Sequence, residues 1–318
     1  MRLFRRSGVC HTRCVGHRLR FQVLSVPSVP MADLIDRFVW LEALGVDVGA
    51  LADHFVDWSK PTNDWFECWT TLAAIAAKTS SMRLTSCVTQ IPLRNPAMLA
   101  KQAITVDHIS GGRLEIGLGT GITIDPSTEM IGQQNWSEGE RVERFGEYVE
   151  IVDSILVEEV TSFSGRYYQV SGAESHPRPV QRPRPPIMVG ALGPRMIRRA
   201  ARYADIWNSL SFSDDFDVQL AETAERVDRM RHECATAGRD AGDVRFSYTI
   251  FDAEARPKGG RIRYYESEDL FVELVERAIA LGMSEISLYY PMDATQLPVF
   301  ERLMTQTVPA IRARHATT

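Results

Sequence analysis

The feature that most constrains this chain is a repeated alternation of short apolar runs with longer amphipathic stretches. The apolar runs have the length and composition of buried strands, and the stretches between them have the spacing of helices that pack on one face. Strands that alternate with helices demand parallel pairing and right-handed crossovers. Eight such units in a chain of this length favour an α/β fold that is a closed (β/α)8 TIM barrel over an open doubly wound sheet.

The expected strands cover residues 19–26, 46–55, 82–88, 114–119, 187–191, 204–210, 244–251 and 285–290. The expected helices of the repeat cover residues 33–45, 65–80, 96–110, 195–203, 216–237, 269–281 and 296–314. A long insertion separates the fourth strand from the fifth, and it combines a helix, a hairpin-like piece and an extended proline-rich run over residues 138–157, 162–170 and 176–186. After the seventh strand, residues 252–267 form either a substrate-facing loop or a solvated surface loop.

Composition narrows the class of protein. At 318 residues, with 44% apolar and 24% charged residues, the chain can bury a core of barrel size. Its net charge of −5 is not that of a protein with the basic surface that binds nucleic acid. No apolar run approaches the roughly 20 residues of a membrane span. We therefore expect a cytoplasmic protein whose partner is a small molecule. The five cysteines are scattered without CxxC spacing, which indicates reduced thiols and no metal site.

The first residues differ from the rest. Residues 1–17 are basic and contain no acidic side chain. A targeting segment would need an apolar stretch and a small-residue cleavage site, and neither follows. We expect a disordered N-terminal extension over residues 1–17, with an upstream translation start as another possibility, and one barrel domain over residues 18–318.

Polar residues follow the second expected strand. Asp53 and His54 come at its end, and Trp58 follows four residues later. A histidine exchanges a proton near neutral pH, a neighbouring carboxylate can fix its orientation, and an indole supplies a flat wall. The same pair could equally be a helix cap or a packing feature.

Three other strand ends are candidates for binding. Residues 86–90 are small and polar and could let a flat ring approach the backbone. The glycines of residues 117–121 permit close approach, but Ile122 stands where a dinucleotide fingerprint needs its third glycine. Residues 190–196 lead through glycines into a helix whose free N–H groups suit a phosphate, with Arg195 nearby. The alternative is that these strand ends are ordinary turns without a binding role and that the arginines are simply solvated.

Taken together, residues 94–121, the ADHFVDW segment (52–58), SGRYY (164–168) and residues 193–208 resemble the bacterial luciferase-like superfamily of flavin and deazaflavin oxidoreductases. The resemblance implies the (β/α)8 barrel with its insertion after strand four. DHFVDW is similar to the segment of the actinobacterial branch that uses coenzyme F420. The resemblance therefore implies coenzyme F420 as cofactor, with FMN as the alternative, and a homodimer.

The resemblance also assigns site residues. It implies that His54 moves a proton beside the transferred hydride, that Asp53 contacts the cofactor and helps to hold the imidazole, and that Trp58 walls the substrate side. It implies a non-proline cis peptide between Cys87 and Val88 against the central ring. The remaining cofactor contacts implied are Thr120 and Gly121 at the ring edge, and Gly190, Ala191, Gly193 and Pro194 around the phosphate.

One departure bears on the substrate. The sugar-phosphate dehydrogenases of this branch carry a glutamate where this chain has Ile122, which disfavours glucose 6-phosphate. Aromatic residues near strand ends favour a fairly apolar ketone, alcohol or activated alkene, although they could equally be core: Trp58, Trp65, Tyr264, Tyr289 and Tyr290. An FMN-dependent monooxygenase that uses O2 and a non-catalytic barrel are the alternative functions.

Overall fold

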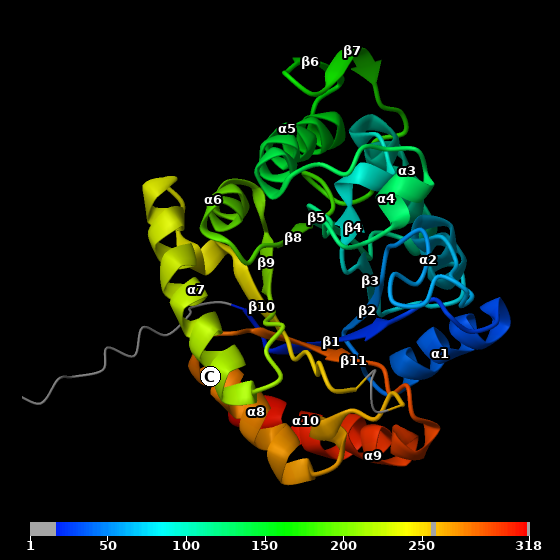
Figure 1. Cartoon of the computed structure of the whole chain (residues 1–318), viewed down its shortest axis with the longest axis vertical. Coiled ribbons are helices and arrows are strands. Elements are labelled where there is room, and N and C mark those ends of the chain that lie inside the picture. The colour runs from blue at the N-terminus through cyan, green and yellow to red at the C-terminus, as the bar shows by residue number, and fades with distance from the viewer. Residues whose placement is uncertain (1–16, 256–258, 317–318) are drawn as a thin grey trace, which may run out of the picture.

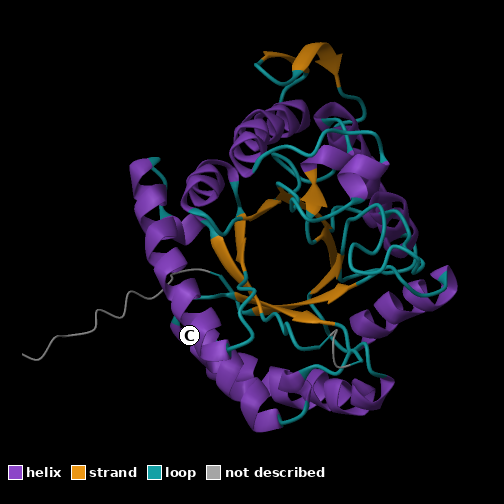
Figure 2. Ribbon diagram, in the orientation of Figure 1, coloured by secondary structure: helices purple, strands orange, loops and turns teal. Residues whose placement is uncertain are grey.

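The computed structural model describes residues 17–255 and 259–316, and their strands close into a parallel barrel (Figure 2). The hydrogen-bonded order is β3-β2-β1-β11-β10-β9-β8-β5, and a further β3–β5 pairing closes the ring. The barrel strands are β1 (Arg20–Ser25), β2 (Val48–Leu51), β3 (Arg83–Ser86), β5 (Leu114–Gly119), β8 (Ile187–Gly190), β9 (Ile206–Ser209), β10 (Arg245–Thr249) and β11 (Glu285–Tyr289). The predicted TIM barrel is confirmed.

Helices surround this ring on the outside (Figure 1). They are α1 (Met31–Ala43), α2 (Cys68–Ala76), α3 (Pro96–Ser110), α6 (Pro194–Tyr203), α7 (Phe216–Thr236), α8 (Glu268–Ala280), α9 (Leu297–Arg302) and α10 (Val308–Arg314). Their apolar faces bury against the strands, as Leu34, Phe38 and Leu41 of α1 do. Gly49 of β2 is required there, because a Cβ on it would lie 2.7 Å from a ring carbon of Phe38.

The insertion has two of the parts expected from the sequence, a helix and a hairpin, whereas residues 176–186 form a series of bends with cis peptide bonds before Pro177 and Pro183. It contains α5 (Glu138–Val157) and an antiparallel hairpin of β6 (Val160–Ser164) and β7 (Gln169–Glu174). The short α4 (Ser127–Met130) precedes α5. Figure 1 shows the hairpin at the outer edge of the molecule beyond α5. The insertion therefore leaves the barrel intact.

Three other expected elements differ from the structure. The helix expected over residues 65–80 begins only at Cys68, because the side chain of Glu67 accepts hydrogen bonds from the backbone of Trp69 and Thr70 and caps it. The third strand breaks after β3 and continues as β4 (Thr89–Gln90). The last helix is interrupted by a π-helical turn over Leu303–Thr307, next to Pro309, which has no N–H to donate.

The two ends of the barrel differ in chemistry. At the amino ends of the strands, Arg20 donates to Glu285 and to both carboxylate oxygens of Glu115 at 2.7 Å, and Arg83 also donates to Glu115. The two glutamates of this ionic cluster are buried, the two arginines are partly exposed, and together they close the floor of the barrel. The carboxyl ends, by contrast, carry the residues singled out from the sequence. The expected extension lies outside the described residues except for His17.

Candidate functional site

Parallel strands bring all the predicted site residues to one rim. His54 follows β2, Val88 lies between β3 and β4, Thr120 follows β5, and Gly190 ends β8. Because these strands run in the same direction, their carboxyl ends meet at the same mouth of the barrel. The loops after them therefore build one site.

The imidazole of His54 is held by a carboxylate from another loop. Its Nδ1 lies 2.6 Å from Oδ2 of Asp125, and 19% of the His54 side chain is exposed. The Asp125 side chain is fully buried, and its other oxygen accepts the backbone N–H of Ser127 at 2.8 Å. The imidazole is thus anchored on one edge and open to the rim on the other.

Gln90 fixes the tautomer of this imidazole. Its Nε2 lies 3.0 Å from the carbonyl oxygen of Asp53, 2.8 Å from Oδ2 of Asp125 and 2.8 Å from Nδ1 of His54. An amide nitrogen has two hydrogens, and the two oxygens are acceptors only, so both hydrogens are committed to them. Nδ1 of His54 must then carry its own hydrogen and donate it to Asp125. The nitrogen left for chemistry is Nε2.

Asp125 is ionised at neutral pH. Burial alone would raise the pKa of this carboxyl, but hydrogen bonds from His54, Ser127 and Gln90 outweigh burial and hold the pKa well below its usual range. This fixed negative charge lies 2.6 Å from Nδ1 and holds the orientation of the ring. The pair therefore leaves Nε2 as the nitrogen at which a proton can be exchanged.

Asp53 does not hold the imidazole, contrary to our expectation. Its carboxylate is buried and receives both terminal nitrogens of Arg94, which also donates to Glu67 at 2.7 Å. Burial raises the pKa of Asp53, while the Arg94 guanidinium opposes the rise. Asp53 acts on the site through its backbone carbonyl, which positions Gln90. A cofactor contact of Asp53 stays a prediction.

The aromatic ring beside His54 is Trp65. The two rings pack edge to face, with centroids 5.5 Å apart. The indole nitrogen of Trp65 is buried and has no hydrogen-bond partner among the described residues. Trp65 lies in the loop before α2 because Glu67 starts that helix late. Trp58 is half-buried in the same loop, and its predicted role beside the substrate stays a prediction.

The third strand bulges into the mouth of the barrel at Val88. The peptide bond between Cys87 and Val88 is cis, as the resemblance implied. A Cβ on Gly119 would lie 2.5 Å from Cγ2 of Val88, and one on Gly190 would lie 3.5 Å from Cγ1. Glycines on β5 and β8 thus leave room for Val88 between them. Burial raises the pKa of Cys87 to about 12, so its thiol stays protonated and is no nucleophile at neutral pH.

The turn after β5 is fixed from the insertion. Arg141 of α5 is buried and donates to the carbonyl oxygen of Thr120 at 2.9 Å. Gly121 has a φ of 74°, and a Cβ on it would lie 2.5 Å from Oε1 of Gln90. Only glycine fits there, so the turn and the His54 anchor are packed as one unit.

The loop from β8 to α6 leaves helix N–H groups free. Gly193 is the N-cap of α6, is exposed and supplies no side-chain cap, and Pro194 opens the helix. The preceding Ala191 is buried, and its carbonyl oxygen accepts the indole N–H of Trp207 at 2.9 Å. The exposed start of α6 has the donors and the dipole that a phosphate needs.

Several site residues were missed by sequence reasoning. Asp125, Arg94 and Arg141 carried no local signal, because each acts on a residue from a distant loop. Gln90 could have been found, since it ends the strand that was singled out. Of the aromatic residues, Tyr264 is fully buried in the core, whereas Tyr289 and Tyr290 line a cavity at the rim. The predicted substrate-facing role of residues 252–267 stays a prediction.

Over the described ranges, no group of three or more histidine, cysteine, aspartate and glutamate side chains is arranged to hold a metal ion. Among the same residues, no helix has the length and apolar character to span a bilayer.

Comparison with known proteins identifies the family. The family model of luciferase-like monooxygenases matches residues 14–256, and the chain belongs to this family. The resemblance seen in the sequence is therefore confirmed.

One relative in sequence and two solved structures illustrate the similarity. An F420-dependent glucose-6-phosphate dehydrogenase of Intrasporangium calvum is 29% identical over 269 residues, which cover 78% of this chain and 79% of that protein. Among solved structures, an F420-dependent secondary alcohol dehydrogenase in complex with an F420-acetone adduct superposes with a TM-score of 0.77 at 15% identity, over 91% of this chain and 99% of its own. A monooxygenase of Streptomyces bottropensis superposes with a TM-score of 0.69 at 22% identity, over 92% and 100%. These two likenesses concern the fold.

Proposed function

We propose that this chain is a coenzyme F420-dependent oxidoreductase that transfers a hydride between the deazaflavin and a small, fairly apolar organic substrate. The observation that carries the proposal is the anchored imidazole of His54, whose free Nε2 opens on the same rim as the Val88 bulge and the uncapped start of α6. The F420-dependent name of the relative in Intrasporangium calvum supports the same cofactor.

The residues at the rim fit such a cofactor. Gly119 and Gly190 lack the side chains that would crowd Val88, so a flat ring can lie against that side chain. The exposed start of α6 after Gly193, which has no side-chain cap, suits the phosphate of the cofactor's side chain. The buried indole N–H of Trp65 is a donor in need of an acceptor. When bound, coenzyme F420 would supply hydride chemistry at C5 of its ring, and the barrel its orientation.

His54 would handle the proton that accompanies the hydride. For reduction of a carbonyl group, Nε2 begins protonated and donates its proton to the oxygen while the carbon gains the hydride. For oxidation of an alcohol, Nε2 begins neutral and accepts the hydroxyl proton. In both directions Nδ1 keeps its hydrogen bond to Asp125, which holds the ring in place.

The substrate side of the rim is apolar. Phe55, Ile124 and Met130 expose 53%, 71% and 50% of their surfaces, and the Phe55 N–H is bonded to Ser127, which joins the two loops. Large apolar side chains this exposed at a site favour an apolar partner. They support a ketone, secondary alcohol or activated alkene.

A second candidate is an FMN-dependent monooxygenase that uses reduced flavin and O2. The description of the matching family as luciferase-like monooxygenases favours it. Both candidates use the same rim and differ in the ring that it holds.

Separate titrations of the purified chain with coenzyme F420 and with FMN test the proposal. We expect coenzyme F420 to bind at least about tenfold more tightly, a difference of about 1.4 kcal/mol. A matched oxygen-electrode assay with each reduced cofactor should show no enzyme-dependent O2 uptake with reduced F420. Tighter binding of FMN together with O2 uptake would overturn the proposal in favour of the monooxygenase.

A further inference from the structure

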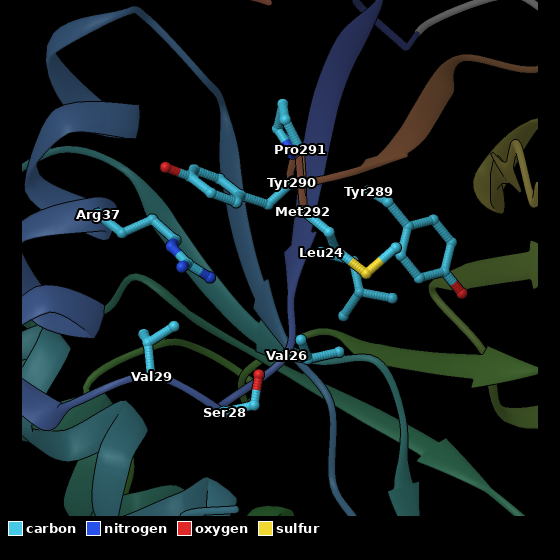
Figure 3. A pocket seen from close by; sticks show the side chains of 9 residues that line it. All are labelled: Leu24, Val26, Ser28, Val29, Arg37, Tyr289, Tyr290, Pro291 and Met292. Atoms are coloured by element: carbon cyan, nitrogen blue, oxygen red, sulfur yellow. The ribbon is translucent and has the colours of Figure 1, made fainter. Parts of the chain in front are cut away.

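A small cavity opens at the carboxyl ends of β1 and β11. Its volume is about 120 Å³, room for a few heavy atoms. Figure 3 shows its walls, which come from the β1–α1 loop, from α1 and from the end of β11. The lining is Leu24, Val26, Ser28, Val29, Arg37, Tyr289, Tyr290, Pro291 and Met292. All but two of these residues are apolar or aromatic.

This cavity adjoins the candidate site. Three of its lining residues, Leu24, Val26 and Tyr289, take part in a small apolar cluster against which Trp65 also packs. Trp65 is in turn the ring that packs against His54. The cavity and the candidate site thus share one apolar wall at the rim of the barrel.

Arg37 gives the cavity a positive charge. It lies on α1, donates to Oγ of Ser25 at 2.7 Å and stacks on Tyr290 with its guanidinium carbon 3.9 Å from the ring centre. Figure 3 shows the guanidinium extending from the helix toward the middle of the cavity. Among the described residues, no carboxylate lies within 4 Å of it, and Asp33, one turn earlier on α1, acts on it only over a longer distance. Burial lowers the pKa of Arg37, while its hydrogen bond with Tyr290 and the charge of Asp33 oppose the fall.

The start of α1 borders the same cavity. Pro30 is its N-cap and supplies no side-chain hydrogen bond to the first turn, and Ser28 and Val29 of the cavity wall directly precede it. Asp33 lies in the first turn of α1 and offsets the positive end of the helix dipole, so Arg37 is the positive charge that matters at the cavity. The apolar walls keep water away and strengthen its attraction for an anion.

We propose that this cavity binds the acidic end of the substrate, which is a small apolar molecule that carries a carboxylate. Arg37 is the residue that recognises the carboxylate, because a guanidinium fork matches its two oxygens, and Oγ of Ser28 is the second polar group of the wall. The assignment of the cavity to the substrate rests on the proposed function. A carboxylate with a short branched chain fits the volume, whereas a sugar phosphate is too large and too polar.

Calorimetric titration of the chain with isobutyrate and with isobutyramide, which has the same shape without the charge, tests this inference. We expect isobutyrate to bind at least about tenfold more tightly to the natural chain. Arg37→Gln should abolish this preference and Arg37→Lys should restore part of it, whereas the control Arg231→Gln, which removes an arginine of α7, should leave it unchanged. Equal binding of the two probes, or a preference that survives in Arg37→Gln, would overturn the inference.

Two further measurements separate the possible failures. Val29→Trp fills the cavity and leaves Arg37 unchanged, and it should also weaken the binding of isobutyrate. Melting curves establish that each variant is folded. Titration of the same variants with coenzyme F420 reports on the proposed function alone. Loss of F420 binding with an intact carboxylate preference refutes the proposed function, and F420 binding without that preference refutes only the cavity assignment.

Discussion

The chemistry of His54 is set by residues that the local sequence around it does not contain. Asp125 lies 71 residues further along the chain, and Gln90 lies 36 residues further. Together they leave Nδ1 as the donor and Nε2 as the free nitrogen. This assignment makes the roles of His54 and Asp125 separable by mutation.

Replacement of His54 by alanine should remove proton transfer and spare cofactor binding. We expect turnover to fall by ~10²–10⁴-fold, the range typical of removing a general acid or base, with an F420 affinity that changes little. Steady-state rates and a fluorescence titration measure the two quantities. His232→Ala, on the exposed face of α7, is the control. Unchanged turnover in His54→Ala would remove the residue from the mechanism.

Replacement of Asp125 by asparagine should disturb the tautomer. The amide can present an N–H to Nδ1 and drive the proton to Nε2, so we expect turnover to fall by between about 10-fold and 10⁴-fold, the upper value being that of a like change in the serine-protease triad. Nitrogen NMR of the imidazole shows which nitrogen carries hydrogen. Glu129→Gln removes an exposed carboxylate of the adjacent helix α4 and should change neither quantity. An unaltered tautomer in Asp125→Asn would contradict the anchor.

At this scale the sequence indicated where chemistry lies and not how it is arranged. The aspartate and histidine at residues 53 and 54 were visible as a pair, yet Asp53 turns to Arg94. The carboxylate that holds His54 is instead Asp125, and this hydrogen bond joins the loops after β2 and β5. Contacts between loops depend on the closure of the barrel, which local patterns do not report.

Among the elements, α6 offers the clearest test of the cofactor site. Gly193 has an ordinary φ of −82°, and a Cβ there would meet nothing within 4 Å, so substitution costs the fold little. Gly193→Asp places a favourable N-cap on the helix and a negative charge where the phosphate is proposed. We expect a stabilised fold and an F420 affinity at least about tenfold weaker, because like charges at short range repel by more than 1.4 kcal/mol. Gly193→Ala, which adds bulk without charge, is the matched control, and an F420 affinity equal in both variants would place the phosphate elsewhere.

The end of α1 supplies a pH-dependent contact. Glu42 accepts backbone hydrogen bonds from Ser80, Ser81 and Met82 at 2.6–2.9 Å. Partial burial would raise the pKa of Glu42, but these donors outweigh it and lower the pKa to about 2. A carboxyl with a depressed pKa in the folded state stabilises the protein above its unfolded pKa of 4.5 and loses that effect as the pH falls toward 2.

Unfolding of Glu42→Gln should reflect this window. We expect its free energy of unfolding to be lower than that of the natural chain at pH 7, with a difference that shrinks between pH 4.5 and pH 2. Denaturant titrations across this range measure it. Glu301→Gln, at an exposed position of α9, should show no such trend. A difference that is constant with pH would contradict the role of the charge.

Element boundaries were predictable where capping residues mark them. Asn95 caps α3, Pro96 opens it and Gly111 ends it with a φ of 65°, and the expected helix agrees with the observed one. The predicted start of α2 was wrong because Glu67, the third residue of the expected helix, is its N-cap. That single capping residue frees Trp65 to pack beside His54.

For the whole molecule, the alternation of strands and helices was sufficient to predict the barrel and the rim that carries the site. It could not predict the division between the two ends. The ionic cluster of Arg20, Glu115 and Glu285 closes the floor, while small residues such as Gly119 and Gly190 open the mouth. Arg20 and Glu285 of this cluster meet only after the first and last strands pair.

The central claim is that one rim holds both the flat redox ring and the imidazole that serves it. A crystal structure of the chain with coenzyme F420 tests it most directly. The account predicts a ring in contact with Val88, a phosphate at the start of α6, and Nε2 of His54 facing the reactive side of the ring. A cofactor bound with its phosphate at another loop, or with its ring out of reach of His54, would contradict it.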